Sequence, residues 1–470
     1  MIIRSVKEIA DMVGGRIRQP ERGGQLVKGV FTDTRNVLTG GLFVPLTGER
    51  FNGHRFVADA LLKGAAVSFW QEDEDDQPMD ATLIYVDDPL LALQRLASAY
   101  RKTLSTRIVA VTGSNGKTST KDILAAMLAG KYRVHKTKGN LNNHIGVPLM
   151  LLQLSPETEI AVLEMGMSAR GEIALLSHLA QPEAAIITMI GESHLEHLGS
   201  RLGIAEAKME IIEGLQPNGL LVLPKDEPLL DDVLHRVDLP LGTRVLRIGD
   251  DSSADYFAQD IHCLTQPVRM KFQPVLSGSS NPFPQLELSL LGKHHVRNAM
   301  TAFAMAKWLG LRSVEIIKGL AQLQMTAMRS QVIETHSGWT IINDAYNASP
   351  SSVRAAILAL RDLSTKARNV VILGDMLELG EDSAALHAEI GAFLNPKCEH
   401  VVFSFGNDCR HLHREVLKKY SAEQARHFET KAALLSALSD VLLPGDWVLV
   451  KGSRGMKMEE VVTAMQSVVS

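Results

Sequence analysis

The chain has 470 residues, of which 45% are hydrophobic and 22% are charged, a globular composition that excludes collagen-like, low-complexity and disordered classes. Its 49 Lys and Arg residues against 53 Asp and Glu residues give a net charge of −4, without the positive excess that a nucleic-acid partner requires. At roughly 150 residues per domain, the length predicts about three domains.

Targeting signals and cysteine frameworks are absent from the sequence pattern. Charged side chains interrupt residues 1–13 before an apolar signal core can form, and no run of about 18 apolar residues follows. The three cysteines lack Cys-x-x-Cys spacing and predict neither a disulfide framework nor a zinc site. We therefore expect a cytoplasmic protein without membrane insertion, and we take a monomer as its expected state.

Residues 1–104 predict a small mixed α/β domain. Short strand-like runs at 42–46 and 65–70 are separated by glycine-containing turns. The acidic stretch 71–80 has the composition of a surface loop.

Residues 105–325 predict a second domain with a parallel sheet. Apolar runs of strand length at 108–111, 160–165 and 184–190 alternate with segments of helical periodicity. The stretch 243–291 is richer in Ser, Pro and alternating residues, and we interpret it as an antiparallel addition to this sheet.

Residues 326–470 predict a third, Rossmann-like domain, because the alternation of strands and helices restarts there. The predicted strands are 339–343, 370–374, 400–406 and 447–451, and the predicted helices begin near residues 351, 383 and 430.

The strongest local motif is a phosphate-binding loop in the second domain. A buried strand, 107–112, leads into Gly113, Gly116, Lys117 and Thr118, and a helical segment follows. Backbone N–H groups of such a turn wrap phosphate oxygens, the lysine balances phosphate charge and the threonine ligates Mg²⁺. The loop is a short variant, because Val111 stands where the general pattern has its first glycine. The predicted nucleotide-binding residues of the loop are Gly113, Ser114, Asn115, Gly116, Lys117, Thr118 and Ser119.

Two further strands end in polar groups that suit a metal ion. The run 160–164 delivers Glu164 at its carboxyl end, and the run 185–191 leads to His194. Taken alone, a strand-end glutamate is commonly just solvated, and a histidine after a strand is usually a loop residue. Beside a phosphate loop, both become candidates for a Mg²⁺ and ATP site. The fold class is therefore α/β with three domains: a small mixed N-terminal domain, a central P-loop ATPase-like parallel-sheet domain and a Rossmann-like C-terminal domain.

A set of motifs distributed over nearly the whole chain resembles the Mur ligases, the ATP-dependent amide ligases of peptidoglycan precursor synthesis. These motifs are 112–118, 139–143, 164–166, 194–200, 206–208, 295–298, 344–347, 374–380 and 451–454. Within the family, 344–350, 374–380 and the N-terminal segments 32–35 and 48–54 are similar to the member that adds D-alanyl-D-alanine.

The resemblance implies an amide ligation driven by ATP. The terminal carboxylate of a UDP-N-acetylmuramoyl tripeptide would become an acyl phosphate, and the amine of D-alanyl-D-alanine would then attack it. Other Mur ligases and a folylpolyglutamate synthase-like ligase share the loop and the three-domain plan and remain alternatives. A P-loop ATPase that forms no amide bond is a further alternative from a different class.

The resemblance also implies metal ligands. Thr118 and Glu164 would hold one Mg²⁺, and His194 would help to hold another. The family lysine at the position of Lys208 is carbamylated, which turns a cation into an anionic oxygen ligand. On residue type alone, a lysine on a helix such as 203–215 is a solvated surface residue.

The catalytic residues that the resemblance implies are Lys117, Lys208, His194 and Asn298. Asn298 would lie near the ATP purine and phosphates, and Arg329 and Asp344 would reach ATP from across a cleft, which requires domain closure. The alternative for Asn298 is an amide that caps a helix over 298–309.

Substrate contacts are also implied by the resemblance. Thr34 and Arg35 match the uridine-diphosphate contact, with Asn52 and His54 nearby, although a surface turn is the alternative. Tyr346 and Asn347, together with Asp375 and 451–454, match third-domain motifs for the dipeptide and closure. Asn142 and Asn143 complete the predicted substrate residues. Three positions depart from the family pattern: Asn343, Ser349 and Pro224, the last of which brings no amide to read a base.

Overall fold

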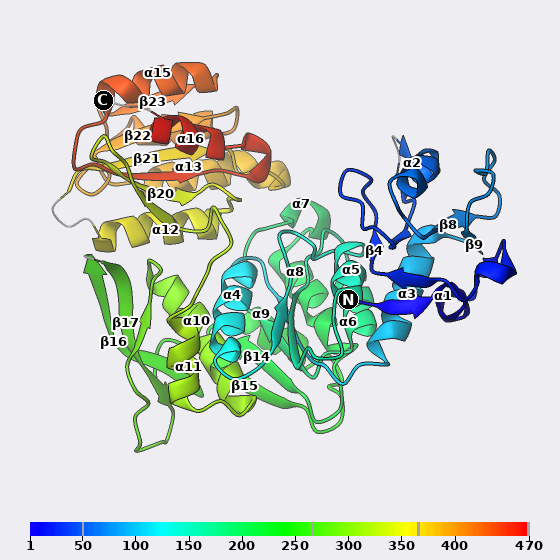
Figure 1. Ribbon diagram of the computed structural model, residues 1–470. Helices are drawn as coiled ribbons and strands as arrows, with labels where there is room; N and C mark the ends of the chain where they lie inside the picture. Colours follow the sequence, from blue (N-terminus) through cyan, green and yellow to red (C-terminus); the bar gives the residue numbers. More distant parts are fainter. Residues whose placement is uncertain (49–50, 266, 364–366, 468–470) are drawn as a thin grey trace.

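A computed structural model describes residues 1–48, 51–265, 267–363 and 367–467. The chain forms three lobes in sequence order, coloured from blue through green to red in Figure 1. Each lobe contains its own main sheet, so the predicted three-domain α/β fold class is confirmed. Glu49 and Arg50, in the predicted motif 48–54, lie outside the described residues.

The N-terminal lobe is built on a five-stranded sheet in which only β2 is antiparallel to its neighbour. The order is β2 (Arg16–Ile17), β9 (Leu83–Val86), β8 (Val67–Gln71), β5 (Leu42–Phe43) and β4 (Val30–Phe31). Two small pairs, β1 (Ile3–Ser5) with β3 (Leu26–Lys28) and β6 (Thr47–Gly48) with β7 (Phe51–Asn52), and helices α1 (Val6–Val13), α2 (Val57–Leu62) and α3 (Pro89–Arg101) complete it. The strand expected over 42–46 is therefore confined to its first two residues.

The middle lobe contains a nine-stranded sheet. Its order is β11 (Val134–Lys136), β12 (Ile160–Glu164), β10 (Arg107–Thr112), β13 (Ala184–Ile187), β14 (Leu220–Pro224), β15 (Arg244–Ile248), β16 (Tyr256–Thr265), β17 (Val268–Leu276) and β18 (Leu286–Leu288). The prediction of an antiparallel addition over 243–291 was wrong for its first part, because β15 pairs in parallel with β14. It is confirmed for β16, β17 and β18.

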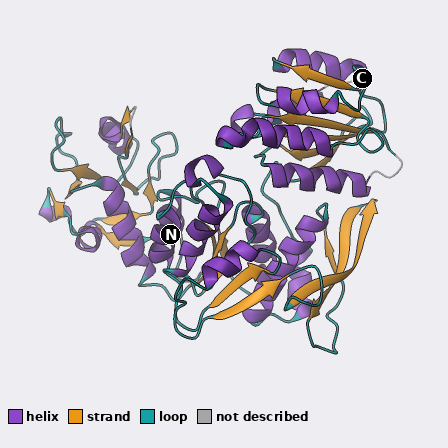
Figure 2. Ribbon diagram, turned by 180° about the vertical axis from the view of Figure 1, so that it is seen from behind, coloured by secondary structure: helices purple, strands orange, loops and turns teal. Residues whose placement is uncertain are grey.

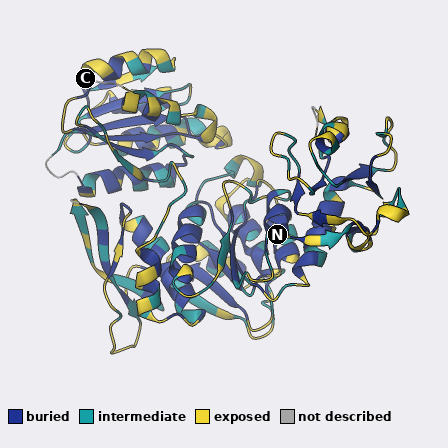
Figure 3. Ribbon diagram, viewed as in Figure 1, coloured by how far each residue is buried: buried dark blue, intermediate teal, exposed yellow. Residues whose placement is uncertain are grey.

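Helices cover both faces of the parallel part of this sheet, which explains the unbroken apolar run in β10. Ile108 and Ala110 face one hydrophobic cluster, while Val109 and Val111 face another. The first cluster includes side chains of α5 (Gly146–Leu152), α6 (Glu172–Ala180), α8 (Arg201–Met209) and α9 (Pro228–Leu234). The second includes α4 (Lys117–Ala129), α10 (Lys293–Trp308) and α11 (Ser313–Leu320). Figure 3 shows the central strands buried between helices with exposed outer faces.

The third lobe contains a six-stranded sheet that is parallel except for its first strand. The order is β19 (Gln331–Glu334), β20 (Thr340–Asp344), β24 (Trp447–Lys451), β21 (Asn369–Gly374), β22 (Val401–Phe405) and β23 (Ala425–Phe428). Helices α12 (Pro350–Leu363), α13 (Ser383–Phe393), α14 (Cys409–Val416), α15 (Lys431–Val441) and α16 (Glu459–Ser467) flank it, as the view from behind in Figure 2 shows.

The third lobe rests on the antiparallel part of the middle sheet through α12. Leu291, from the middle lobe, is 1% exposed and packs in the same apolar cluster as Val353 and Ile357 of α12. Cys263 and Val268, from β16 and β17, contact the same cluster. The two lobes therefore meet through packed apolar surface, and the cavity described below lies beside this contact.

The N-terminal and middle lobes share one continuous core. The cluster that covers one face of the middle sheet extends through α3 and α1 to strands β8 and β9 of the N-terminal sheet. A polar contact also crosses this boundary. The buried Tyr100 hydroxyl donates to the Leu154 carbonyl at 2.9 Å. Within the described residues, none of the helices combines the length and apolar composition needed to cross a bilayer.

We expect Leu96→Ala to destabilise the N-terminal and middle lobes together. Leu96 of α3 is fully buried in the shared core, and a Leu→Ala change in such a site costs about 2–5 kcal/mol of unfolding free energy. Denaturant unfolding should show a single shifted transition for these two lobes. Leu91→Ala, at a half-exposed position of the same helix, is the matched control and should change stability little. Separate transitions for the two lobes would contradict a shared core.

Candidate active site

The phosphate loop joins β10 to α4 at the centre of the molecule. Gly113 and Gly116 have φ of +145° and +83°, in the region that favours glycine. A Cβ on Gly113 would lie 1.9 Å from the Thr188 hydroxyl, and one on Gly116 would lie 2.9 Å from the Asn298 side-chain oxygen. Both glycines are therefore needed for close packing as well as for backbone conformation.

A cavity of about 800 Å³ opens over this loop, between the middle and third lobes. It is lined by all seven loop residues of the prediction except Gly113, and by Asn142, Asn143, Glu164, His194, Lys208, Asn298, Arg329, Asp344, Tyr346 and Asn347. The structure thus brings together in one cavity most of the site residues that the sequence indicated.

Thr118 and Glu164 form a buried oxygen-rich pair. The Thr118 hydroxyl donates to one carboxylate oxygen of Glu164 at 2.9 Å, and the Asn142 amide donates to the other at 2.9 Å. The Glu164 side chain is 4% exposed, and the Lys121 ammonium lies 4.0 Å from it. Arg329, on the segment that leads to the third lobe, donates to the Thr118 hydroxyl at 3.3 Å. Hydroxyl and carboxylate oxygens are the donors that Mg²⁺ prefers.

The Lys117 side chain folds back over the phosphate loop that precedes it. Its ammonium donates to the Gly113 carbonyl at 2.7 Å and to the Ser114 carbonyl at 3.4 Å. Desolvation lowers the pKa of Lys117, while the nearby Glu164 carboxylate opposes this shift and Arg329 adds to it. The loop therefore holds a cation whose hydration is already partly removed.

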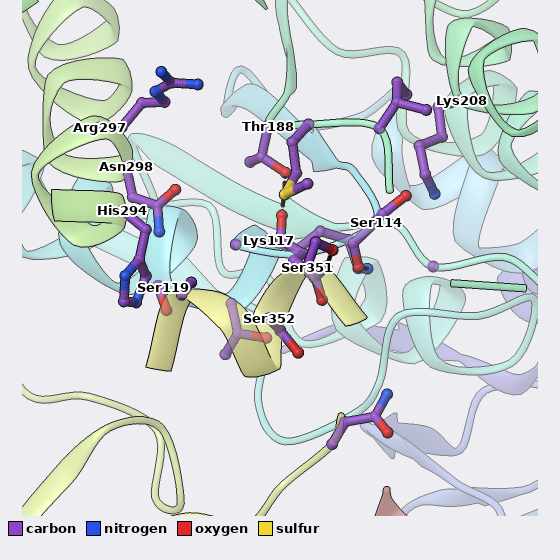
Figure 4. A pocket seen from close by; sticks show the side chains of 18 of the residues that line it. Ser114, Lys117, Ser119, Thr188, Lys208, His294, Arg297, Asn298, Ser351 and Ser352 are labelled. Atoms are coloured by element: carbon purple, nitrogen blue, oxygen red, sulfur yellow. Dashed lines mark hydrogen bonds between the residues drawn. The ribbon is translucent and has the colours of Figure 1, made fainter. Parts of the chain in front are cut away.

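Lys208 is a buried lysine on α8 that faces the cavity. The residue is 1% exposed, and within the described part of the chain its amine has no hydrogen-bond or carboxylate partner. Burial lowers the pKa of Lys208 well below its usual value, the nearby Lys117 charge lowers it further, and Glu210 opposes the shift. Figure 4 shows its amine reaching toward the phosphate loop. The unpaired amine of Lys208 differs in this from the ammonium of the buried Lys121, which donates to the Thr137 carbonyl at 3.0 Å.

Helix α10 presents a polar face to the cavity on the other side of the loop (Figure 4). Asn298 lies in the second turn of this helix, since α10 begins at Lys293, so the alternative of a helix-capping amide was wrong. His294 and Arg297 also line the cavity, and sequence reasoning missed both. His294 lies three residues before Arg297 and four before Asn298, a spacing that places the three near one face of the helix and could have indicated them. Arg297 pairs with Asp226 at 3.0 Å and with Asp250.

The third lobe contributes a charged cluster. The Asp344 carboxylate accepts from the Lys451 ammonium at 2.6 Å and from the Ser330 N–H at 3.0 Å. Lys451 also donates to the Asn347 carbonyl at 2.8 Å. Tyr346 lies under the Arg329 guanidinium, 4.0 Å from the ring centroid, in a cation–π contact. These contacts join the strand end of β20 to the segment between the lobes.

Two polar contacts link the lobes at the cavity itself. Asn115 of the phosphate loop donates to the hydroxyls of Ser349 at 2.9 Å and Ser351 at 3.1 Å, beside the start of α12. His194, just before α7 (Leu195–Leu198), has its Nδ1 atom 2.8 Å from the Glu378 carboxylate of the third lobe. Asn143 instead faces its own lobe, where its side-chain oxygen accepts from the Gly146 N–H at 2.9 Å.

The predicted residues of the N-terminal lobe lie apart from this cavity: none of Thr34, Arg35, Asn52 and His54 is among its described lining residues. Arg35 is exposed and pairs with Asp33 at 2.8 Å, which lowers the pKa of Asp33 to about 2. His54 is buried, and both ring nitrogens are engaged: Nε2 accepts from the Gln71 N–H, and Nδ1 lies 3.0 Å from the Asn52 side-chain oxygen. The ring therefore has no free nitrogen for a ligand.

Gly113→Ala should strongly impair productive use of the nucleotide. The added Cβ would overlap Thr188 and displace the loop, and an ångström-scale misplacement of this kind costs about 100-fold in rate. Phosphate release from MgATP, with the peptide and amine substrates that the family resemblance implies also present, measures the effect. Gly139→Ala is the control, because Gly139 also has positive φ, of +55°, yet nothing lies within 4 Å of its Cβ position. Equal losses in both variants would mean that backbone strain alone, and not the Thr188 contact, accounts for the requirement.

Comparison with known proteins agrees with this geometry along the whole chain. Residues 26–101 match the family described as Mur ligase family, catalytic domain, residues 111–306 match the Mur ligase middle domain, and residues 328–454 match the Mur ligase, glutamate ligase domain. The UDP-N-acetylmuramoyl-tripeptide--D-alanyl-D-alanine ligase of Bacillus subtilis (strain 168) is 46% identical over 462 residues, which cover 98% of each chain.

Solved structures are similar over the same extent. A crystal structure of MurF from Acinetobacter baumannii has a TM-score of 0.87 at 30% identity and covers 100% of both chains. The MurF ligase from Thermotoga maritima in complex with ADP has a TM-score of 0.81 at 30% identity, covering 94% of this chain and 97% of that chain. The chain belongs to the Mur ligase family.

Proposed function

We propose that this chain joins D-alanyl-D-alanine to a UDP-N-acetylmuramoyl tripeptide. The tripeptide's terminal carboxylate attacks the γ-phosphorus of ATP, the bond to the β-phosphate breaks, and an acyl phosphate and ADP result. The dipeptide's neutral amine then attacks the acyl carbon, phosphate leaves, and the nitrogen loses a proton as the amide forms. Membership of the Mur ligase family makes the chain an ATP-dependent amide ligase, which favours this reading over a P-loop ATPase that forms no bond.

The observation that carries the proposal is the cavity between the middle and third lobes. Its floor is a phosphate loop with the buried Thr118–Glu164 pair, and an unpaired buried amine, Lys208, faces the same space. An ATPase needs the first feature alone, whereas the second suits a site that also handles a carboxylate. The choice of the dipeptide and tripeptide as substrates rests on the full-length similarity to relatives named for them.

The first step brings two anions together, so its main requirement is positive charge at fixed positions. Lys117 and Arg329 both point at the loop that would hold the phosphates, and the glycine turn supplies backbone N–H groups. Asn298 approaches the same loop from α10 and is assigned to the nucleotide. Asp344 is assigned to ATP from the third lobe, and Ser114, Asn115 and Ser119 to its phosphates.

Of the residues assigned to Mg²⁺, Thr118 and Glu164 fit a metal that prefers oxygen ligands. Thr118 and Glu164 offer oxygen donors that already converge within 2.9 Å, and a carbamate on Lys208 would add another anionic oxygen. His194 offers a nitrogen donor, which suits softer metals better. When bound, Mg²⁺ would offset the charge of the phosphates during transfer.

Substrate contacts are assigned to all three lobes. Thr34 and the exposed Arg35 would bind the uridine diphosphate, because a guanidinium forks onto phosphate oxygens. The interior position of His54 supports a role in holding Asn52 and the surrounding loop instead of direct contact. Tyr346 and Asn347 are assigned to the dipeptide, and Asn142 and Asn143 to the tripeptide side of the cavity.

We also propose the domain boundaries, the cellular compartment and the oligomeric state. Residues 1–104 would bind the UDP-muramoyl substrate, 105–325 would bind ATP, and 326–470 would bind D-alanyl-D-alanine and close on ATP. The protein would act in the cytoplasm as a monomer, where both ATP and nucleotide-linked precursors are available.

The test is phosphate release from MgATP with a matrix of UDP-muramoyl peptides of increasing length and candidate amines. We expect release only when a tripeptide and D-alanyl-D-alanine are both present, with a pentapeptide as product. Varying the tripeptide's third residue in the same matrix reads its specificity. Release with a shorter peptide and a single amino acid would point to another Mur ligase reaction, and release with neither substrate would point to an ATPase.

Lys208 should carry a carbamate. Formation of a carbamate requires neutral amine, and an ordinary lysine with a pKa near 10.4 is only about 0.1% neutral at pH 7.5. Because burial lowers the pKa of Lys208, a larger share of its amine is neutral and available to carbon dioxide than in an ordinary lysine. We expect a protein-bound carbamate signal in the ¹³C spectrum after exchange with ¹³C-bicarbonate at neutral pH.

The controls compare Lys208 with a second buried lysine, Lys121. Lys208→Ala should remove the carbamate signal and most of the ligase activity, and added short carboxylates should restore part of that activity. Lys121→Met should keep the signal, because the Lys121 ammonium is held between Asp122 and the Thr137 carbonyl and does not face the cavity. A Lys208→Ala enzyme with normal activity that gains nothing from carboxylates would rule out the modification.

A further inference from the structure

A loop of the third lobe reaches into the middle lobe at His194. The loop follows β21 and leads into the short 3₁₀ helix η4 (Gly380–Asp382). Its Glu378 carboxylate lies at an ion-pair distance of 2.8 Å from His194 Nδ1, a buried atom that has no aligned hydrogen bond in this arrangement, and a Cβ on Gly380 would lie 3.4 Å from Glu196 of α7. This contact was not among the predicted site features, although the motif 374–380 that contains Glu378 was.

The loop is fixed from inside the third lobe. The Leu377 N–H donates to the Ser453 hydroxyl at 2.8 Å, and the Met376 N–H donates to His387 Nε2 at 3.0 Å. The buried Asp375 carboxylate accepts from the Cys409 N–H at 2.8 Å. The residues before Glu378 therefore have little freedom, and the position of its carboxylate follows from the position of the whole lobe.

Asp375, His387 and Cys409 lie close enough together to suggest a metal site, but their bonds are already made. His387 Nε2 accepts from Met376, and Nδ1 lies 2.8 Å from the Ser383 carbonyl, so both ring nitrogens are used. Burial and the neighbouring Asp375 raise the pKa of the Cys409 thiol well above its ordinary value, which disfavours the thiolate. The cluster is an anchor for the Glu378 loop.

Both ends of the contact have unusual backbone conformations. Glu378 has φ of +63° and His194 has φ of +66°, in the left-handed region that residues with a side chain seldom adopt. Such conformations persist only where the surroundings impose them, and they concentrate at functional sites. Here two of them lie on opposite sides of one interdomain contact.

We propose that Glu378 is a positioning residue, which holds the His194 imidazole by Nδ1 and leaves Nε2 directed to the metal. The inference rests on the proposed function, in which His194 is a metal ligand. Histidine ligands commonly donate their second ring N–H to a carboxylate, which fixes the tautomer and the ring orientation. Among the described residues, Nε2 has no partner, so it is available for this role.

The two residues of this contact come from different lobes. His194 belongs to the middle lobe and Glu378 to the third, so the imidazole is fully oriented only when the third lobe is in place. The same lobe brings Asp344 to the cavity and Ser349 to the phosphate loop. Arrival of the third lobe would thus complete both the nucleotide contacts and the metal site.

The experiment measures Mn²⁺ binding to the full chain in the presence of saturating ADP, from the electron paramagnetic resonance signal of free Mn²⁺. His194→Ala identifies the Mn²⁺ equivalent that depends on the imidazole. Glu378→Gln should weaken that same equivalent about ten-fold, the lower end of the effect of losing a carboxylate partner. The double variant should bind no more weakly than His194→Ala, because Glu378 acts through His194.

Glu381→Gln is the matched control, since Glu381 is exposed in η4, three residues after Glu378, and no hydrogen bond or ion pair of its side chain is described. It should leave Mn²⁺ binding unchanged. The thermal unfolding midpoint of Glu378→Gln should match that of the wild type, because the Glu378 side chain is 55% exposed.

Two results would overturn the inference in different ways. Wild-type Mn²⁺ binding by Glu378→Gln, with His194→Ala impaired, would remove the role of Glu378 and leave the proposed function intact. Wild-type binding by His194→Ala would remove the ligand assignment and the inference with it. The substrate matrix tests the ligase reaction separately, because it needs neither variant.

Discussion

The burial of one carboxylate, Glu164, constrains the rest of the active site. A carboxylate at the end of a buried strand must be paired or hydrogen-bonded, because an isolated buried charge is too costly. Thr118 and Asn142 each bond one of its oxygens, and Lys121 lies 4.0 Å away. These partners come from α4 and from the segment before α5, so the carboxylate fixes the phosphate loop against two neighbouring elements.

The same constraint explains why two buried lysines near the loop have different chemistry. Lys121 contacts Asp122 at 3.4 Å and the Thr137 carbonyl at 3.0 Å, and the cation is thereby compensated. Lys208 has no such partner among the described residues, and after burial the cation of Lys117 is the larger of the two charge effects that shift its pKa. Burial without compensation favours the neutral amine. A fold that needed Lys208 only for packing would gain stability from an apolar residue, so the retained amine points to chemistry.

The sequence predicted the parts of the site that depend on local structure. The phosphate loop and Glu164 were found because a buried strand and the turn after it are continuous in sequence. The start of α10 was missed by five residues, because Lys293 and His294 face the cavity and so interrupt the apolar periodicity that marks a helix. Residue type also does not reveal that the ring of His54, which the sequence predicts near the substrate, is buried with both nitrogens bonded.

Contacts between lobes lay beyond local sequence reasoning, and they decide how the site works. The contacts of Asn115 with Ser349 and of His194 with Glu378 join residues separated by 234 positions in the first case and by more than 180 in the second. No periodicity relates such residues. Ser349 was noted only as a departure from the family pattern, yet its hydroxyl is what reaches the phosphate loop.

Placing part of the site on a separate lobe has a chemical rationale. An acyl phosphate is destroyed by water, so a ligase gains if the groups that promote its formation assemble only when the cavity is covered. A half-exposed pair such as His194 and Glu378 adds little to stability in either state. Its role in the proposed reaction follows from its position, because the pair joins the two lobes across the boundary that would close over the nucleotide. At the cavity the contacts between the lobes are polar and weak, so the cavity would be able to reopen for product release while the apolar contact at α12 stays packed.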